Sequence, residues 1–261
     1  MKVSEHVDAL AEHGTLLADV ASQTPLDAPV PSCPGWQLRD LLRHAGYVHR
    51  WAARFVAEQL PGPVPELSEA EQLASGPPDA GLTGWFRDGH AALVATLRSA
   101  DPGVCAWAFL PSPSPLAFWA RRQAHETAIH RIDAELAAGR TAAVGTAFAA
   151  DGIDELIMGF FGRDAEELTA EQRATPARSL LVRATDAGKS WAVTLTAAGE
   201  QAAAVCRGAG EAADCVVEGP AAGLYLLLWN RAAPADAGVA VSGAADVLAT
   251  WRAGMRVVWG D

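Results

Sequence analysis

Residues 121–133 read RRQAHETAIHRID and hold two histidines and a glutamate within a short span. Glu126 and His130 are four residues apart, so on a helix they lie one turn apart on one face. His125 and His130 are five residues apart, which separates them by roughly 140° around the helix axis. A zinc-protease helix instead has its two histidines four residues apart. The spacing therefore predicts that Glu126 and His130, without His125, face a common ion.

The same segment has two distinct faces. His125 falls in register with the apolar residues Ile129 and Ile132, a stripe that should face a core. Arg122, Glu126, His130 and Asp133 share the polar stripe. One carboxylate and one imidazole are two ligands, so a third must come from another segment.

The best source of a third ligand is residues 33–51, CPGWQLRDLLRHAGYVHRW. Apolar residues recur there at helical spacing, which predicts a long amphipathic helix after a Pro-Gly turn. His44 would point from this helix toward the interior, and His49 is displaced toward the flank. The remaining histidines are expected to be structural: at the surface or half-buried for His6, His13, His49 and His90, and in the interior for His125.

Together the two segments resemble the mycothiol-dependent maleylpyruvate isomerase family, whose amino-terminal domain is a DinB-like helical bundle. The residues that carry the resemblance are Cys33-Pro34-Gly35-Trp36, Asp40-Leu41-Leu42, His44, Arg122, Ala124-His125-Glu126-Thr127, His130-Arg131 and Asp133-Ala134-Glu135. The resemblance implies that His44, Glu126 and His130 bind a divalent metal, usually zinc. Gln37 departs from the family pattern, which commonly has Thr or Ser there, so the cap of the second helix should be weaker.

The first part of the chain is predicted to be a four-helix bundle covering residues 1–165. Such bundles place metal sites between facing helices. Proline- and glycine-rich linkers separate the helices, one over residues 61–81 and one around Pro111, Pro113 and Pro115. The four helices are expected near residues 3–22, 37–60, 82–100 and 116–138, with a fifth near 146–162 that joins the two parts.

From about Arg178 the hydrophobic period changes from helical to alternating, which predicts short antiparallel strands. Residues 166–261 are therefore predicted to form a smaller domain, which makes the chain α+β. This part resembles the family's carboxy-terminal domain more weakly, in residues 218–220, 226–231 and 241–243. The strands are expected near residues 180–184, 191–195, 202–206 and 239–242, and the helices near 220–231 and 244–258.

Composition narrows the function class. The net charge of −11 and the dispersed basic residues argue against nucleic acid as a partner. No run of about twenty apolar residues suggests a membrane span, and the amino terminus does not read as a secretory signal, so a cytoplasmic protein is expected. A monomer is expected because the sequence shows no long exposed apolar stripe. The four cysteines form no Cys-x-x-Cys pair and are read as reduced thiols, with Cys206 and Cys215 on adjacent strands.

Two histidines and one carboxylate leave a divalent ion with an open coordination position, as in catalytic zinc sites. The resemblance implies that mycothiol is the thiol cofactor or cosubstrate. A metal-bound thiol is deprotonated and becomes a nucleophile. In the resembled isomerases the thiolate adds to a cis double bond and leaves after rotation, and other members transfer it to an electrophile. The sequence indicates neither the electrophile nor the native metal.

Arg122, Asp133 and Arg231 are candidates for catalysis, and Arg131 is a further candidate for substrate contact. Asp133 could orient His130, or could bond Arg131 or solvent instead. Arg122 and Arg131 could contact an anionic substrate or the sugar of the thiol, or form an ion pair within the helix. Arg231 could reach a metal cleft if the two domains pack face to face.

Two other function classes stay open. A metal-bound water in place of the thiol would make the protein a hydrolase. A fourth protein ligand that closed the coordination sphere would make it a non-catalytic metal-binding or sensing protein. Activity without added thiol would favour the hydrolase, and a closed coordination sphere would favour the non-catalytic protein.

Overall fold

The structure is a computed structural model that describes residues 1–65, 67–163, 176–196, 202–208 and 212–254. The chain divides into two compact units, a helical unit from Met1 to Ala142 and a sheet unit from Ala143 to Val258. The division falls earlier in the chain than the predicted boundary at residue 165. Each unit is described separately below.

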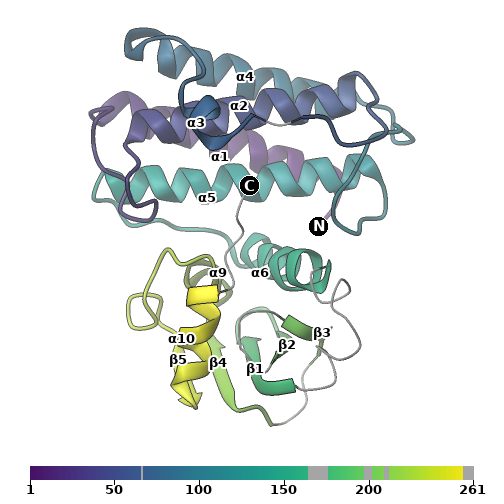
Figure 1. Cartoon of the computed structure of the whole chain (residues 1–261), viewed down its shortest axis with the longest axis vertical. Coiled ribbons are helices and arrows are strands. Elements are labelled where there is room, and N and C mark those ends of the chain that lie inside the picture. Colours follow the sequence, from purple (N-terminus) through teal and green to yellow (C-terminus); the bar gives the residue numbers. More distant parts are fainter. Residues whose placement is uncertain (66, 164–175, 197–201, 209–211, 255–261) are drawn as a thin grey trace. The chain divides into compact units, whose positions relative to one another are not determined.

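The helical unit is a four-helix bundle, as predicted. Its long helices run alongside one another in Figure 1, with α1 packed on α5 and α4, and α2 packed on α4 and α5. A short helix, α3 (Glu69–Leu73), interrupts the segment 61–81 that was predicted to be a linker. The four long helices are α1 (Val3–Gln23), α2 (Leu38–Ala57), α4 (Asp79–Ser99) and α5 (Pro115–Ala137).

Leucines at helical spacing build the core of this bundle. Leu38, Leu41 and Leu42 on α2 are fully buried together with Leu17 of α1 and Phe86 of α4. Residues three and four apart share one helix face, so α2 presents a continuous apolar stripe to its neighbours. That stripe holds the helix in one rotation about its axis, and the same rotation sets the direction of His44.

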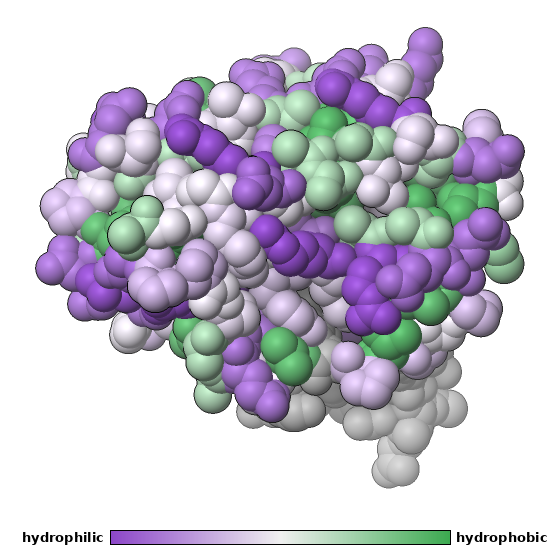
Figure 2. Space-filling view, turned by 90° about the horizontal axis from the view of Figure 1, so that it is seen from above, coloured by the Kyte–Doolittle hydropathy of each residue, from purple (hydrophilic) through white to green (hydrophobic). Residues whose placement is uncertain are grey.

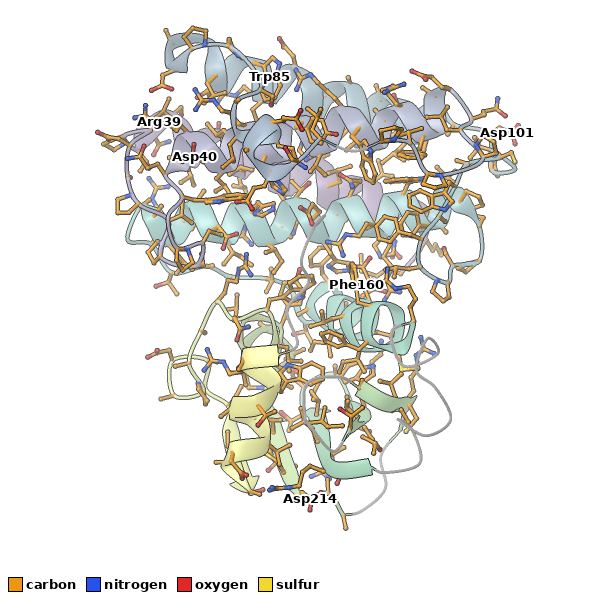
Figure 3. All side chains as sticks on the ribbon, viewed as in Figure 1. Arg39, Asp40, Trp85, Asp101, Phe160 and Asp214 are labelled. Atoms are coloured by element: carbon orange, nitrogen blue, oxygen red, sulfur yellow. The ribbon has the colours of Figure 1, made fainter. Side chains whose placement is uncertain are left out.

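α2 and α4 approach closely at one glycine. A Cβ atom at Gly46 would lie 2.2 Å from Cζ3 of Trp85, so no larger residue fits there without movement. The guanidinium of Arg50, one turn further along α2, lies 3.9 Å from the centre of a Trp85 ring. Arg39 and Asp40 lie near the beginning of the same helix, and Trp85 is on α4 (Figure 3).

Two helix starts matter for the site. The Ser114 hydroxyl accepts a hydrogen bond from the N–H of Ala117 at 3.2 Å, and Pro115 occupies the first turn, where a missing N–H costs nothing. At the start of α2 the Gln37 side chain makes no cap hydrogen bond, as predicted. Oδ2 of Asp40 accepts a hydrogen bond from the N–H of Gln37 at 2.9 Å instead, so the helix keeps one of the two hydrogen bonds of a capping box.

The sheet unit begins with α6 (Thr146–Asp154), which continues into a π-helical segment, η1 (Glu155–Phe161). Five strands form one mixed sheet in the order β3-β2-β1-β4-β5. β1 pairs antiparallel with β2 and parallel with β4, and the outer pairs are antiparallel. The remaining elements are β1 (Pro176–Ala184), β2 (Lys189–Thr196), β3 (Ala202–Arg207), β4 (Cys215–Gly219), α9 (Ala221–Leu228), β5 (Ala240–Gly243) and α10 (Ala245–Gly254).

The α+β class and most strand positions were predicted, but three details were wrong. β4 was missed, because it is only five residues long and has two adjacent valines, which weaken the alternating signal. β4 also runs parallel to β1, so the sheet is not purely antiparallel. Cys206 and Cys215 are not on neighbouring strands, since β2 and β1 lie between β3 and β4. Residues 255–258 of the last predicted helix lie outside the described residues.

Asp154 explains why the fifth predicted helix belongs to the sheet unit. At the end of α6 its carboxylate accepts hydrogen bonds from Nε1 of Trp191 on β2 at 3.0 Å and from Nη2 of Arg207 on β3 at 2.8 Å. These bonds tie α6 to two strands, and α6 also packs on α9.

The surface carries few large apolar side chains. Among the described residues only Met1, Leu16 and Leu67 are exposed large hydrophobics. In the space-filling view, hydrophilic residues cover much of the face seen, and hydrophobic ones form smaller patches between them (Figure 2). None of the helices in the described parts of the chain combines the length and the apolar character needed to span a bilayer.

Candidate metal centre

His44, Glu126 and His130 come together inside the helical unit. His44 is on α2, and the other two are one turn apart on α5. Nε2 of His44 lies 3.4 Å from Oε1 of Glu126, and Nε2 of His130 lies 3.0 Å from the same oxygen. One ligand atom from each residue lies within 4.8 Å of the others, and all three residues are buried. The structure thus groups the three residues that the sequence predicted as metal ligands.

This arrangement fits a small divalent ion. Zinc binds nitrogen and carboxylate oxygen at about 2.0–2.2 Å, so two ligands at corners of a tetrahedron lie about 3.4 Å apart. The nitrogen-to-oxygen distances of 3.4 and 3.0 Å are close to that edge length. Among the described residues, no fourth His, Cys, Asp or Glu belongs to this group. The donor set is therefore an open His2Glu set, which is typical of catalytic zinc.

Asp133 holds the outer nitrogen of the His130 ring. Its Oδ2 lies 3.0 Å from Nδ1 of His130, which is one of the contacts that the sequence left open for Asp133. The Ser32 hydroxyl donates to Oδ1 of Asp133 at 2.5 Å, and Sγ of Cys33 lies 3.7 Å from Oδ2. The loop before α2 therefore anchors the carboxylate that orients His130.

The outer nitrogen of His44 also has a partner. Oε1 of Gln72, on α3, lies 3.0 Å from Nδ1 of His44. Trp36 packs beside the same ring, with ring centres 5.2 Å apart. Both histidines therefore have Nδ1 bound to an acceptor and Nε2 directed at Glu126. This is the usual arrangement of histidines that bind metal through Nε2.

Arg122 acts on the other oxygen of Glu126. Its Nη2 donates to Oε2 of Glu126 at 3.0 Å, and the Arg122 side chain is completely buried. Of the two roles considered for Arg122, the structure shows the ion pair within the helix. The pair differs from a surface ion pair because both groups are out of water.

The charges around Glu126 and His130 explain their pKa shifts. Burial raises the pKa of Glu126, but the charges of His130 and Arg122 outweigh it and hold that pKa well below its ordinary value. Burial lowers the pKa of His130, but Glu126 and Asp133 outweigh it and raise that pKa to about 9. Without an ion, the His130 ring is therefore protonated at neutral pH and donates from Nδ1 to Asp133 and from Nε2 to Glu126. A metal bound at Nε2 would displace the proton on that nitrogen.

The other two arginines named from the sequence lie in different surroundings. Nη1 of Arg131 donates to Oε2 of Glu135 at 2.6 Å, an ion pair within α5. Arg231 belongs to the sheet unit, where its Nη1 donates to the carbonyl of Trp229 at 2.7 Å. A role for Arg231 at the metal stays a prediction.

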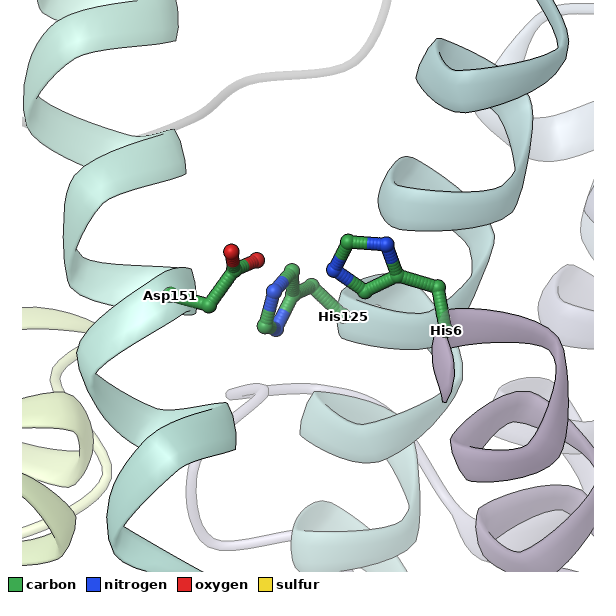
Figure 4. Close-up of side chains that lie close together, drawn as sticks. All are labelled: His6, His125 and Asp151. Atoms are coloured by element: carbon green, nitrogen blue, oxygen red, sulfur yellow. The ribbon is translucent and has the colours of Figure 1, made fainter. Parts of the chain in front are cut away.

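His125 does not belong to the His44–Glu126–His130 group, in agreement with the five-residue spacing. Its ring lies edge-on to that of His6, with ring centres 6.1 Å apart (Figure 4). Asp151, which is also drawn there, belongs to the sheet unit.

The prediction that four histidines lie at the surface or half-buried was wrong. His6, His13, His49 and His90 are all buried. Nε2 of His49 pairs with the Thr127 hydroxyl at 2.8 Å. Nε2 of His90 lies 3.0 Å from the carbonyl oxygen of Leu10. More polar residues are buried in the bundle than helical periodicity predicts, because each long helix packs against more than one other helix.

Three residues near the site were missed in the sequence: Gln72, Ser32 and Cys33 as partners of the ligand histidines and of Asp133. The sequence did contain a signal for Gln72. Ser68 and Glu71 have the spacing of a capping box, and Oε2 of Glu71 accepts from the N–H of Ser68 at 2.9 Å, which starts α3 just before Gln72. No local pattern predicts that Ser32 or Cys33 contacts Asp133, because each contact joins residues about a hundred positions apart.

Comparison with known proteins agrees with this fold. Residues 7–135 match the mycothiol maleylpyruvate isomerase N-terminal domain, and residues 147–250 match the C-terminal domain of the same family. A crystal structure of the mycothiol-dependent maleylpyruvate isomerase is similar, with a TM-score of 0.63 and 16% identity over 93% of each chain. A histidine-to-alanine mutant of that enzyme is similar too, with a TM-score of 0.62 and 15% identity over 93% of each chain.

At such identities the two solved structures show a shared fold. A search of curated proteins gave no match. The two family domains together cover most of the sequence, in the order expected from its two segments of resemblance. The chain therefore belongs to the mycothiol maleylpyruvate isomerase family.

Proposed function

We propose that this protein is a divalent-metal enzyme that uses mycothiol, acting as a cis-trans isomerase or as a thiol S-transferase. The metal, most suitably Zn²⁺, would be held by His44, Glu126 and His130. The observation that carries the proposal is the convergence of Nε2 of both histidines on Oε1 of Glu126, at 3.4 and 3.0 Å. The family membership supplies the thiol and the reaction class.

When bound, the ion supplies a Lewis acid that lowers the pKa of a coordinated thiol, so that the thiol reacts as a thiolate at neutral pH. An open His2Glu set suits this chemistry, because an exogenous ligand can occupy the fourth position. The alternative class of closed, non-catalytic metal sites has a fourth protein ligand. The described residues offer none in this group.

The surrounding residues prepare the site. Arg122 keeps Glu126 ionised, through a buried hydrogen bond of 3.0 Å. Asp133 accepts a hydrogen bond from Nδ1–H of His130, which leaves Nε2 as the ligand atom once an ion displaces the proton on that nitrogen. The burial of all three ligand residues excludes bulk water and strengthens each of these interactions.

The test uses the cobalt-substituted protein. Adding mycothiol should produce a sulfur-to-metal charge-transfer band, and S-methyl mycothiol, which cannot become a thiolate, should produce none. The Glu126→Ala variant should lack the band, and His125→Ala, whose ring lies outside the group, should retain it. Turnover of maleylpyruvate or of another electrophile should require the thiol. Full activity in thiol-free buffer, with no spectral change, would refute the proposal and favour the hydrolase.

A further inference from the structure

We propose that Gln72 is a positioning residue that fixes the ring of His44 with Nε2 as its ligand atom. This inference rests on the proposed metal site. Gln72 lies on α3, in the segment between α2 and α4, and its side chain is buried. Oε1 of Gln72 lies 3.0 Å from Nδ1 of His44, and Nε2 of Gln72 lies 2.7 Å from the carbonyl oxygen of Leu67.

The Leu67 carbonyl settles which way the Gln72 amide faces. A carbonyl oxygen only accepts hydrogen bonds, so the amide NH2 group must face it. The amide oxygen of Gln72 then faces His44, and it too can only accept. Nδ1 of His44 must therefore carry the proton. A flipped amide would bring two oxygens together at Leu67, at 2.7 Å.

The proton on Nδ1 determines what His44 offers to the ion. A neutral imidazole with its proton on Nδ1 has its lone pair on Nε2, the nitrogen that faces Glu126 at 3.4 Å. The favoured tautomer places the Nε2 lone pair opposite Oε1 of Glu126, so that a cation can bind between the two atoms. The other tautomer would have its proton on Nε2, where the ion would bind, and would leave two acceptors facing each other at Nδ1 and Gln72. Gln72 thus selects the tautomer that can bind a metal.

His130 and His44 are oriented in the same way but by different groups. Asp133 is an anion, and Gln72 is neutral. The site already contains two carboxylates, those of Glu126 and Asp133, beside the guanidinium of Arg122. A neutral acceptor at His44 orients the ring without adding a third negative charge. Extra negative charge would weaken the Lewis acidity of a bound ion.

Two hydrogen bonds hold α3 and Leu67 in place, so that Gln72 can position the His44 ring. Oε1 of Glu69 accepts from Nε1 of Trp36 at 2.9 Å, and the N–H of Leu67 donates to the Tyr47 hydroxyl at 3.0 Å. Tyr47 is on α2, less than one turn from His44, and Trp36 packs on the His44 ring. Leu67 and α3 are therefore part of the site, and this short helix presents Gln72 at a defined position.

The experiment measures the tautomer of His44 directly. Protein labelled with ¹⁵N at histidine is studied without metal, in mildly alkaline buffer, by NMR of the ring nitrogens. In the wild type we expect the His44 proton on Nδ1. In Gln72→Met, which keeps the shape but has no amide, we expect it on Nε2, where Glu126 can accept it. Gln23→Met, which changes a surface amide bonded to Arg140, should give the wild-type pattern.

A second measurement is metal affinity, by competition with a chromogenic chelator. Gln72→Met should bind zinc about 10- to 100-fold more weakly than the wild type, which is the usual effect of losing such a partner. Gln72→Glu keeps an acceptor for Nδ1, so it should keep the proton there. If Gln72→Met does not fold, Gln72→Glu decides the matter, since a proton on Nε2 in that variant would contradict the proposal.

Two results overturn the role of Gln72: a proton on Nε2 of His44 in the wild type, or wild-type tautomer and affinity in Gln72→Met. These outcomes differ from failure of the proposed function. A wild-type protein that bound no zinc would refute the metal enzyme, while the NMR comparison would still decide whether Gln72 selects the tautomer.

Discussion

The bundle contains two groups of buried histidines: the site group, His44 and His130, and a second group, His13, His49 and His90. The pKa of His130 shifts in the opposite direction to the pKa values of the second group. In the site group, carboxylates outweigh burial and raise the pKa of His130 to about 9. In the second group, His13, His49 and His90, burial dominates and lowers the pKa of each, to about 3 for His13. Both groups lie in one helical unit and are equally hidden from water. Burial alone therefore does not make a histidine a metal ligand.

The partners of the ring nitrogens make the difference. His130 and His44 each have an acceptor at Nδ1 and a shared carboxylate at Nε2. His49 has a hydroxyl at Nε2, and its Nδ1 is buried without a hydrogen-bond partner among the described residues. The neutral ring of His49, with one hydroxyl as its hydrogen-bond partner, contributes to the packing of the core. Two oriented rings around an ionised carboxylate can hold a cation.

The largest expected effect is a difference in metal content between a variant of the site group and a variant of the second group. His130→Ala should reduce bound zinc to near background, because it removes one of three ligands. His90→Ala, from the second group, should keep close to one ion per chain. Elemental analysis of both purified variants decides this. Loss of the ion from both would mean that the second group also takes part in binding.

Next in size is the pH dependence of stability without metal. The folded pKa of His130, about 9, lies above its ordinary value of 6.5. Its contribution is therefore fully present below pH 6.5 and lost as pH rises toward 9, a change on the order of 1–3 kcal/mol. Denaturant unfolding of the metal-free protein at several pH values should show the fall, and His130→Gln should abolish it.

The second group should show the reverse dependence. The folded pKa of His13, about 3, lies below its ordinary value of 6.5, so the unfolded chain takes up the proton first. Stability from this residue is lost as pH falls from 6.5 toward 3. The same unfolding series should show this fall in His130→Gln as well as in the wild type. A single slope of one sign over the whole range would contradict the comparison.

A smaller effect is expected at the carboxylate that orients His130. Asp133→Asn keeps the shape but removes the charge, and zinc affinity should fall about 10- to 100-fold. Ser32→Ala leaves Asp133 in place but removes its hydroxyl donor, so zinc affinity should fall by less than in Asp133→Asn. Chelator competition measures both. Equal affinity in Asp133→Asn and the wild type would show that the carboxylate only stabilises the fold.

The smallest effect on the site should come from Thr127→Val. This change removes the partner of His49 next to Glu126 in the sequence. We expect a loss of about 1–2 kcal/mol in unfolding free energy, since a buried imidazole nitrogen loses its hydrogen bond. Zinc content should remain unchanged. A matching loss of zinc would place His49 in the site group.

Much of the helical unit was predictable because its signals are local. The positions of the four long helices follow from apolar residues at helical spacing and from caps such as Ser114-Pro115. Strand β4 and helix α3 are five residues each, too short for a periodic signal to stand out. The sheet order likewise could not be read, because the parallel pairing of β1 with β4 joins strands that are separated by two others along the chain.

The sequence by itself determined which three residues could bind a metal. Spacing along one helix places Glu126 and His130 on one face and turns His125 away, since about 3.6 residues make one turn. Only the tertiary structure decided how those ligands are oriented. Gln72 reaches His44 across 28 positions, and Ser32 reaches Asp133 across 101. Such contacts depend on how α3 and the loop before α2 pack on the bundle, and helical periodicity carries no information about them.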